Sequence, residues 1–95
     1  MERLSNQEIA KKIALHKNWE FRDNAIMTSF KLKDFKEVFS KMTQIAFEAE
    51  IMQHHPNWTN SYNQLSISLT THDVNGVSQK DFDLAEAIDK IMKNG

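Results

Sequence analysis

Three of the four histidines in this 95-residue chain occur in one stretch, which is flanked by two acidic residues. His54 and His55 are adjacent, Glu50 precedes them, and His72 and Asp81 follow later in the sequence. Imidazole gains and loses protons near neutral pH, and a carboxylate can orient such a ring by accepting a hydrogen bond from it. These five residues therefore indicate a site for general acid–base chemistry.

A long helix is expected to lead up to the histidine pair. Asp34 and Glu37 have the spacing of a capping box, which marks a helix start. The apolar residues that recur at helical spacing after this start, and that we expect on the inner face, are Phe35, Val38, Phe39, Met42, Ile45, Ala46, Ala49 and Met52. Pro56 lacks an amide hydrogen and keeps His55 out of helical angles, so the helix must end at about Met52.

The ends of the expected elements indicate how the titratable side chains meet. Glu50 and His54 are four residues apart, so we expect Glu50 to accept a hydrogen bond from the His54 ring. Because His54 is at a helix terminus, we expect its ring to contribute little to packing. His72 ends an expected strand just as His55 leaves the helix, and a layered antiparallel fold can bring the three rings together. Asp81 is expected first to cap the last helix, and it can also orient a catalytic ring.

Other interpretations of these residues stay open from the sequence alone. Three histidines near carboxylates can also bind zinc, copper or iron. Against a metal site, His54 and His55 project in different directions from a chain leaving a helix, and the HExxH pattern is absent. Trp58 and Tyr62 either wall a flat heteroaromatic ligand or pack in the core, and His16 is expected to be structural or solvated.

The segments before the long helix predict a helix and a hairpin. Ser5 and Glu8 form another capping box, so a first helix begins near Asn6. Residues 19–32 alternate between apolar and polar around an Asp23-Asn24 turn, which predicts two antiparallel strands.

The segments after the histidine pair predict two more strands and a last helix. Residues 64–70 alternate as a half-buried strand, and residues 57–63 are expected to form a short strand. Asn75-Gly76 turns the chain, and Ser78 with Asp81 caps a helix. The inner stripe of this helix comprises Phe82, Ala85, Ile88 and Met92. The order α-β-β-α-β-β-α predicts an α+β fold, with a four-stranded antiparallel sheet and three helices packed on one face.

Composition narrows the class of protein. Twelve Lys and Arg stand against 13 Asp and Glu, giving a formal charge of −1, so neither direct binding of nucleic acid nor attraction to anionic membranes is expected. Without cysteine, the chain has no disulfide, thiolate nucleophile or Cys-based zinc site. No apolar run suits a secretory signal or a membrane span, so we expect one cytoplasmic domain over residues 1–95.

Two apolar residues on the long helix are expected to face outward. Phe47 and Ile51 project almost opposite to the inner stripe at about 100° per residue. Such a pair at i and i+4 predicts a contact with another subunit.

The histidine segment resembles a known family. Glu50-x-x-x-His54-His55-Pro56, then Tyr62, His72 and Asp81, is similar to the signature of the pterin-4a-carbinolamine dehydratases. The similarity extends through the KDF stretch at Lys33–Phe35 and through SYNQLSISLTTH to the last helix. Gln53 stands where animal members carry an aspartate.

The resemblance implies a lyase activity without metal or organic cofactor. Family members dehydrate 4a-hydroxytetrahydropterin to quinonoid dihydropterin, which recycles the cofactor of aromatic amino acid hydroxylases. His54 and His72 are then expected to be the acid and base on opposite faces of the pterin, His55 to bind and polarise it, and Glu50 to orient His54. Asp81 joins this catalytic set. The residues expected to contact the pterin are Gln53, Pro56, Trp58, Thr70, Thr71 and Asp73.

The resemblance also implies partners. Family members assemble into homodimers or homotetramers through the sheet edge and the long helix, which agrees with outward-facing Phe47 and Ile51. A related animal protein serves as a dimerisation cofactor for a homeodomain transcription factor, so a non-catalytic interaction module is the alternative function.

Overall fold

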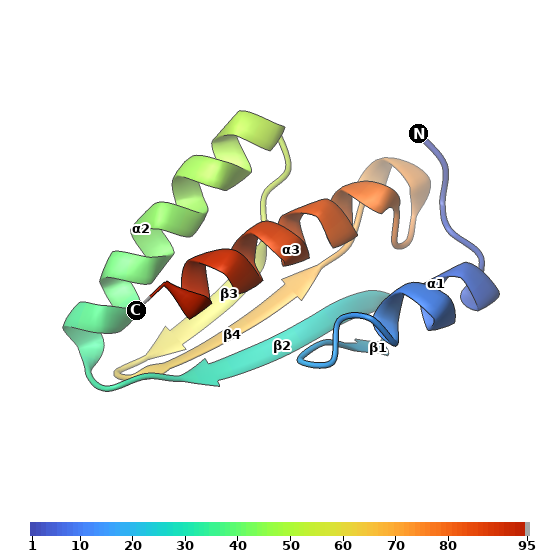
Figure 1. Cartoon of the computed structure of the whole chain (residues 1–95). Helices are drawn as coiled ribbons and strands as arrows, with labels where there is room; N and C mark the ends of the chain where they lie inside the picture. The colour runs from blue at the N-terminus through green and yellow to red at the C-terminus, as the bar shows by residue number, and fades with distance from the viewer. Residues whose placement is uncertain (95) are drawn as a thin grey trace.

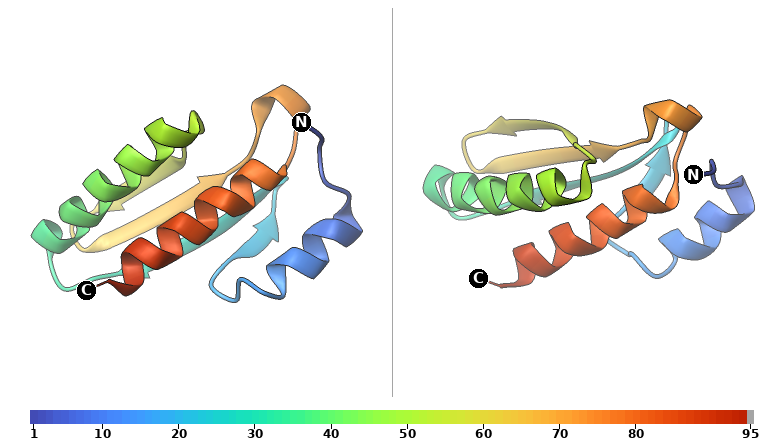
Figure 2. Two further views of the ribbon diagram at one scale, coloured as in Figure 1. Left: turned by 45° about the horizontal axis from the view of Figure 1, so that its top comes forward. Right: turned by 90° about the horizontal axis from the view of Figure 1, so that it is seen from above.

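A four-stranded antiparallel sheet and three α-helices make up the computed structural model, which describes residues 1–94. The elements in chain order are α1 (Asn6–Ile13), β1 (Glu20–Arg22), β2 (Ala25–Lys31), α2 (Phe35–Met52), β3 (Asn57–Ser61), β4 (Gln64–Leu69), a short 3-10 helix η1 (His72–Val74) and α3 (Gln79–Lys93). The strand order is β1-β2-β4-β3, and the helices lie on one side of the sheet (Figures 1 and 2). The fold predicted from the sequence is confirmed.

The helix starts follow the capping residues. In α1 the Ser5 amide donates to Glu8 Oε1 (2.8 Å) and the Glu8 amide donates to Ser5 Oγ (3.1 Å), which is the expected capping box. In α2 the Glu37 amide donates to Asp34 Oδ1 (2.9 Å), but the Glu37 carboxylate accepts from the amide of Lys33, one residue before the cap. The second capping box is therefore offset by one residue from the prediction.

A tight turn joins β1 to β2, and the cross-strand pairs define the register of the sheet. Asp23 and Asn24 both have positive φ (53° and 62°), the combination that suits a two-residue hairpin between β1 and β2. The β2–β4 pairing places Met27 opposite Ser68, and Ser68 in turn lies opposite Asn57. The start of β3 and the end of β4 therefore meet at the same end of the sheet.

The core lies between the sheet and the helices α2 and α3. Its fully buried side chains come from one face of β2 and β4 and from the facing stripes of the two helices: Ile26, Leu65, Ile67, Leu69, Val38, Ile45, Ala49, Leu84, Ala85 and Ile88. Trp19, just before β1, joins this core and donates its Nε1 hydrogen to both carboxylate oxygens of Asp89 (3.0 and 3.2 Å). The Trp19–Asp89 hydrogen bonds thus connect the start of the sheet to α3.

One part of the predicted core is wrong. Phe35 and Phe39 were expected on the inner face of α2, but they are 47% and 57% exposed, and Ala46 is also exposed. At about 100° per residue, the buried stripe centres on Val38 and Ile45, and Phe39 lies about 100° away from it. Phe35 and Phe39 are therefore free to contact another surface.

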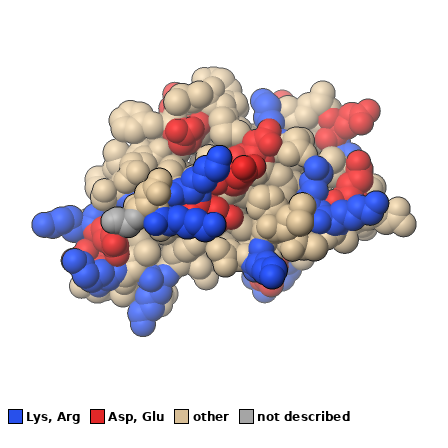
Figure 3. All heavy atoms as spheres, viewed as in Figure 1, with Lys and Arg blue, Asp and Glu red and all other residues tan. Residues whose placement is uncertain are grey.

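The outer surface carries both signs of charge. On the face shown in Figure 3, Lys and Arg side chains alternate with Asp and Glu over α3 and both ends of the molecule, whereas the upper end of α2 is mostly uncharged. Within residues 1–94, every helix is too short or too polar to span a lipid bilayer.

Candidate functional site

The end of α2 turns the chain sharply before the two histidines. Gln53 adopts a left-handed conformation (φ 53°, ψ 42°), and its amide donates to Glu50 O (3.2 Å) while the His54 amide donates to Ala49 O (3.0 Å). This pair of bonds is the Schellman arrangement, in which glycine usually occupies the left-handed position. Because of this turn, His54 leaves the helix axis and enters the interior.

His54 pairs with Asp81 at the start of α3. His54 Nε2 lies 2.5 Å from Asp81 Oδ1, with His54 9% exposed and Asp81 fully buried. An ionised carboxylate only accepts hydrogen bonds, so Nε2 carries the hydrogen and Nδ1 has a free lone pair. Every buried side-chain nitrogen or oxygen within residues 1–94 has a partner, and no hydrogen bond is recorded for Nδ1, so this nitrogen is open to solvent. Nδ1 is therefore the His54 ring nitrogen that is left available to solvent or a ligand.

Two hydroxyl residues hold the other oxygen of Asp81. Asp81 Oδ2 accepts from the Thr71 hydroxyl (2.8 Å) and from the Ser78 amide (2.9 Å). Since Thr71 gives its one hydroxyl hydrogen to Asp81, the Ser78 hydroxyl must donate to Thr71 Oγ1, 2.7 Å away. The first turn of α3 also favours a negative charge at Asp81. Three donors from three chain segments thus fix the carboxylate that orients His54.

The sequence assigned Glu50 to the wrong histidine. Glu50 Oε2 lies 2.5 Å from His55 Nε2, and both side chains are exposed. The i, i+4 relation between Glu50 and His54 fails because left-handed Gln53 ends the helical path before His54 is reached. Asp81 makes both of the contacts predicted for it: it accepts the Ser78 amide as a helix cap, and it binds a histidine ring, that of His54.

His72 lies on a small closed loop at the same end of the sheet. Thr71 and Gly76 exchange backbone hydrogen bonds (2.8 and 3.3 Å), and His72 begins the 3-10 turn between them. The ring is exposed, and the neighbouring Thr71 hydroxyl is bound to Asp81. All three histidines therefore lie at the end of the sheet where β3 starts and β4 ends, with His54 inside and the other two at the surface.

The residues expected to contact a ligand divide into exposed and structural ones. Asp73 is exposed on η1, and Pro56 is partly exposed between His55 and β3. Thr70 Oγ1 donates to Asn24 O (3.0 Å), and Thr71, expected to face the ligand, instead has its hydroxyl buried against Asp81. The Gln53 side chain donates to Glu50 O at the helix end (2.9 Å).

The two aromatic residues near the histidines in sequence do not share their location. Trp58 is partly buried and packs against the core. Tyr62 is exposed in the β3–β4 turn, at the opposite end of β3 and roughly 17 Å along the strand from its start. Tyr62 therefore does not wall a site at the histidines.

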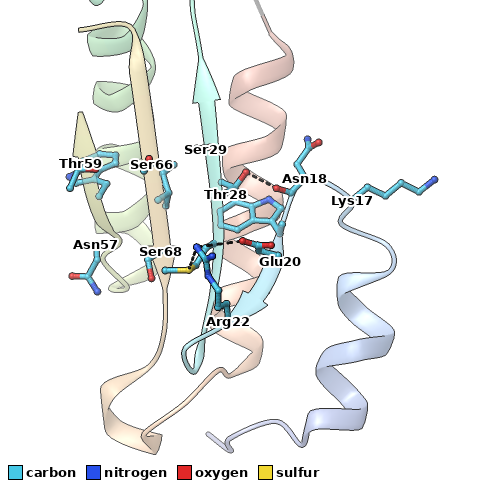
Figure 4. Close-up of a pocket in the computed structure, with 14 residues that line it drawn as sticks. Lys17, Asn18, Glu20, Arg22, Thr28, Ser29, Asn57, Thr59, Ser66 and Ser68 are labelled. Carbon is cyan, nitrogen blue, oxygen red and sulfur yellow. Dashed lines mark hydrogen bonds and ion pairs between the residues drawn. The ribbon is translucent and has the colours of Figure 1, made fainter. Parts of the chain in front are cut away.

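Two cavities lie away from the histidines. One, of about 660 Å³, covers the open face of the sheet, and Figure 4 shows it lined largely by small polar side chains such as Asn57, Thr59, Ser66 and Ser68. The other, of about 460 Å³, lies between the start of α2 and the end of α3. Neither of these two cavities is lined by a histidine.

The histidines of the described residues do not form a cluster of metal ligands. Within the part of the chain that the structure describes, no three His, Cys, Asp or Glu side chains gather closely enough to hold a metal ion. His54 Nε2 and His55 Nε2 are each bound to a carboxylate instead.

The sequence did not reveal the Thr71–Ser78 hydroxyl chain. The sequence predicts Ser78 as a helix cap and Thr71 as a ligand contact beside His72, and neither prediction includes a bond between their hydroxyl groups. A Ser-x-x-Asp cap signals that the Asp lies at a helix start, but which strand residue faces it depends on tertiary packing.

Comparison with known proteins agrees with this architecture. The family model described as pterin 4 alpha carbinolamine dehydratase matches residues 2–91. A protein of Christiangramia forsetii named "Putative pterin-4-alpha-carbinolamine dehydratase" is 51% identical over 99% of this chain and 97% of its own length. A protein of the same name from Rhodospirillum rubrum is 44% identical over 96% and 97%. The chain therefore belongs to the pterin 4 alpha carbinolamine dehydratase family.

A solved structure matches the whole fold. The crystal structure of a transcriptional coactivator/pterin dehydratase from Brucella melitensis superposes with a TM-score of 0.92 at 38% identity, covering 95% of this chain and 98% of that one.

Proposed function

We propose that this protein dehydrates 4a-hydroxytetrahydropterin to quinonoid dihydropterin, with the His54–Asp81 pair as its proton-transfer group. Membership of the family supports the reaction class. The single observation that carries the mechanism is the 2.5 Å contact between His54 and a fully buried carboxylate, which leaves Nδ1 as a base at the surface.

The reaction needs one base and one acid. A ring N–H bond breaks, its electron pair forms a carbon–nitrogen double bond, and the C4a–O pair leaves with the hydroxyl, which takes up a proton and departs as water. His54 Nδ1 accepts the N–H proton, and Asp81 stabilises the resulting imidazolium through the Nε2–H bond. His72 protonates the leaving hydroxyl from the other face of the pterin.

His55 and Glu50 bind the substrate in this proposal. Glu50 Oε2 lies 2.5 Å from His55 Nε2, and both side chains are exposed. The rest of the His55 ring is then available to a flat polar heterocycle. Gln53, Pro56 and Asp73 border the same open surface and supply further contacts. Trp58 supports this surface from the core.

The experiment is direct turnover of a synthetic carbinolamine by the wild type and by His54→Gln. The sequence predicts that the His54 ring contributes little to packing, but His54→Ala would leave the buried Asp81 Oδ1 without its donor at a cost of about 1–3 kcal/mol. Glutamine keeps an N–H donor but cannot exchange protons. His16→Gln, at a partly exposed histidine 4.0 Å from Asp89, is the matched control. Full activity in folded His54→Gln would refute the mechanism.

The same reaction suits cofactor recycling. Its product is an oxidised pterin that a reductase can return to the tetrahydro form, so we place the enzyme after a pterin-dependent aromatic amino acid hydroxylase. Product formation from the pterin released by such a hydroxylase, with and without this protein, tests that role.

Self-association through α2 is part of the proposal. Phe47 and Ile51 are 67% and 75% exposed, and Phe35 and Phe39 extend them along the i+4 ridge of the helix. Ridges of this kind pack against a second helix, and an apolar surface of this length favours a second copy of the chain. Sedimentation should show an oligomer that Phe47→Glu dissociates, whereas Leu15→Glu, at an exposed leucine after α1, should not.

An interaction module is the second candidate function. The Brucella neighbour is described as a transcriptional coactivator as well as a pterin dehydratase, and the exposed α2 ridge offers a protein-binding surface. A wild-type protein that assembles through α2 but turns over no carbinolamine would favour this candidate over the enzyme.

A further inference from the structure

Asn24 links two segments that are far apart in the sequence. It lies in the β1–β2 turn, and its Nδ2 donates to Asn75 O (2.9 Å), 51 residues away. Its own carbonyl accepts the Thr70 hydroxyl (3.0 Å). Asn24 is therefore hydrogen-bonded both to Thr70, just before the loop that carries His72, and to Asn75 within that loop.

The loop itself is closed at its base. The Thr71–Gly76 bridge forms the base, and inside it the Val74 amide donates to Thr71 O (3.2 Å) and the Asn75 amide donates to His72 O (3.0 Å). These bonds fix the shape of the loop but not its tilt relative to the sheet.

The N-terminal residues contact the chain where it leaves the loop, at Gly76 and Val77. The Leu4 amide donates to Val77 O (2.8 Å), and a Cβ on Gly76 would lie 2.8 Å from Arg3 Nε, so the Arg3 side chain lies directly against Gly76. Residues 72–75 otherwise form hydrogen bonds only within their own loop. In the part of the chain that the structure describes, the bond from Asn24 to Asn75 is the one that connects them to another segment.

We propose that Asn24 is a positioning residue that sets where His72 stands relative to the His54–Asp81 pair. Thr71 is fixed on Asp81 at one side of the loop, and Asn24 fixes Asn75 at the other. The tether thus determines the separation between the two rings that act on opposite faces of the substrate. This inference rests on the proposed dehydratase function, in which His72 is the acid.

The test compares Asn24→Gly with Asp23→Gly. Both residues have positive φ, which glycine adopts without strain, so neither change should disrupt the hairpin. Only Asn24→Gly removes the donor to Asn75, and Asp23 takes no part in that contact. The two variants therefore differ in the tether and share the backbone change.

Two measurements decide the outcome. Turnover of a synthetic carbinolamine should show kcat about tenfold lower in Asn24→Gly, with a KM within about twofold and an unchanged melting temperature, because a small displacement of a catalytic group slows the chemical step. Asp23→Gly should match the wild type. Amide hydrogen exchange of Val74 and Asn75 should accelerate in Asn24→Gly alone.

Each failure has a distinct meaning. Equal kcat in both glycine variants, with an active wild type, would overturn the positioning role and leave the dehydratase intact. An inactive wild type would refute the proposed function, and the positioning role with it. Unchanged exchange at Asn75 in Asn24→Gly would overturn the tether itself, whatever the activity.

Discussion

Asp81→Asn is the sharpest test of the geometry, because it keeps the shape of the side chain and removes its charge. The Asp81 carboxylate accepts three donors: His54 Nε2–H, the Thr71 hydroxyl and the Ser78 amide. An amide accepts with one oxygen only. If that oxygen stays with Thr71 and Ser78, the new NH₂ group faces His54 Nε2 and forces the hydrogen of the ring onto Nδ1.

The magnitude follows from these bonds. A hydrogen bond to a charged group contributes about 1 kcal/mol more than a neutral one, so three of them predict a loss of about 2–3 kcal/mol. For a domain of this size that lowers the melting temperature by roughly 10–20 °C, within a total stability of roughly 5–14 kcal/mol. The variant should remain folded at 25 °C. With Nδ1 protonated, the base is lost and kcat should fall by about 10²–10⁴-fold.

The assay pairs kinetics with ¹⁵N NMR of the His54 ring, whose two nitrogen shifts distinguish the tautomers. Asp89→Asn is the matched control: it lies on the same helix, is partly buried and accepts from Trp19 Nε1, but has no contact with His54. We expect Asp89→Asn to cost about 1 kcal/mol and to leave kcat within about twofold. Wild-type turnover in folded Asp81→Asn, or an unchanged His54 tautomer, would refute the reasoning.

Three further predictions concern the ends of helices. Gln53→Gly should raise stability by about 0.5–1 kcal/mol in thermal unfolding, because glycine has no penalty at this left-handed position; a loss would mean that the Gln53 side-chain bond dominates. Glu50→Gln should raise KM more than it lowers kcat, since Glu50 holds His55 and not His54, and a kcat loss like that of the Asp81 variant would contradict this pairing. The amide and then the hydroxyl of Ser5 hold the pKa of Glu8 below 4.5, so the capping box stabilises the fold above that pH and is lost as the pH falls through the lowered pKa. The melting-temperature gap between wild type and Glu8→Gln should close as the pH falls through the lowered pKa of Glu8, and a pH-independent gap would rule out the carboxylate as its source.

Local signals were enough for the elements of this fold. Capping residues and proline placed the starts of the three helices and the end of α2, and alternation placed β2 and β4, because these features depend on backbone groups within a few residues. The same signals placed the histidines at element ends, and antiparallel pairing brought those ends together.

Burial on α2 was less predictable from the sequence. Phe35 and Phe39 fit a helical apolar stripe as well as Val38 does, but only the position of α3 decides which side of α2 is covered. An exposed apolar ridge and a core stripe have the same periodicity, so periodicity alone cannot separate them.

The sequence determined which side chains are available for proton transfer, and the tertiary structure decided how they pair. Spacing favoured Glu50 as the partner of His54, because residues four apart face each other on a helix. One left-handed residue, Gln53, broke that relation and sent His54 to Asp81 on α3, 27 residues away. A contact across that distance depends on how the sheet and helices pack, and no local pattern encodes it.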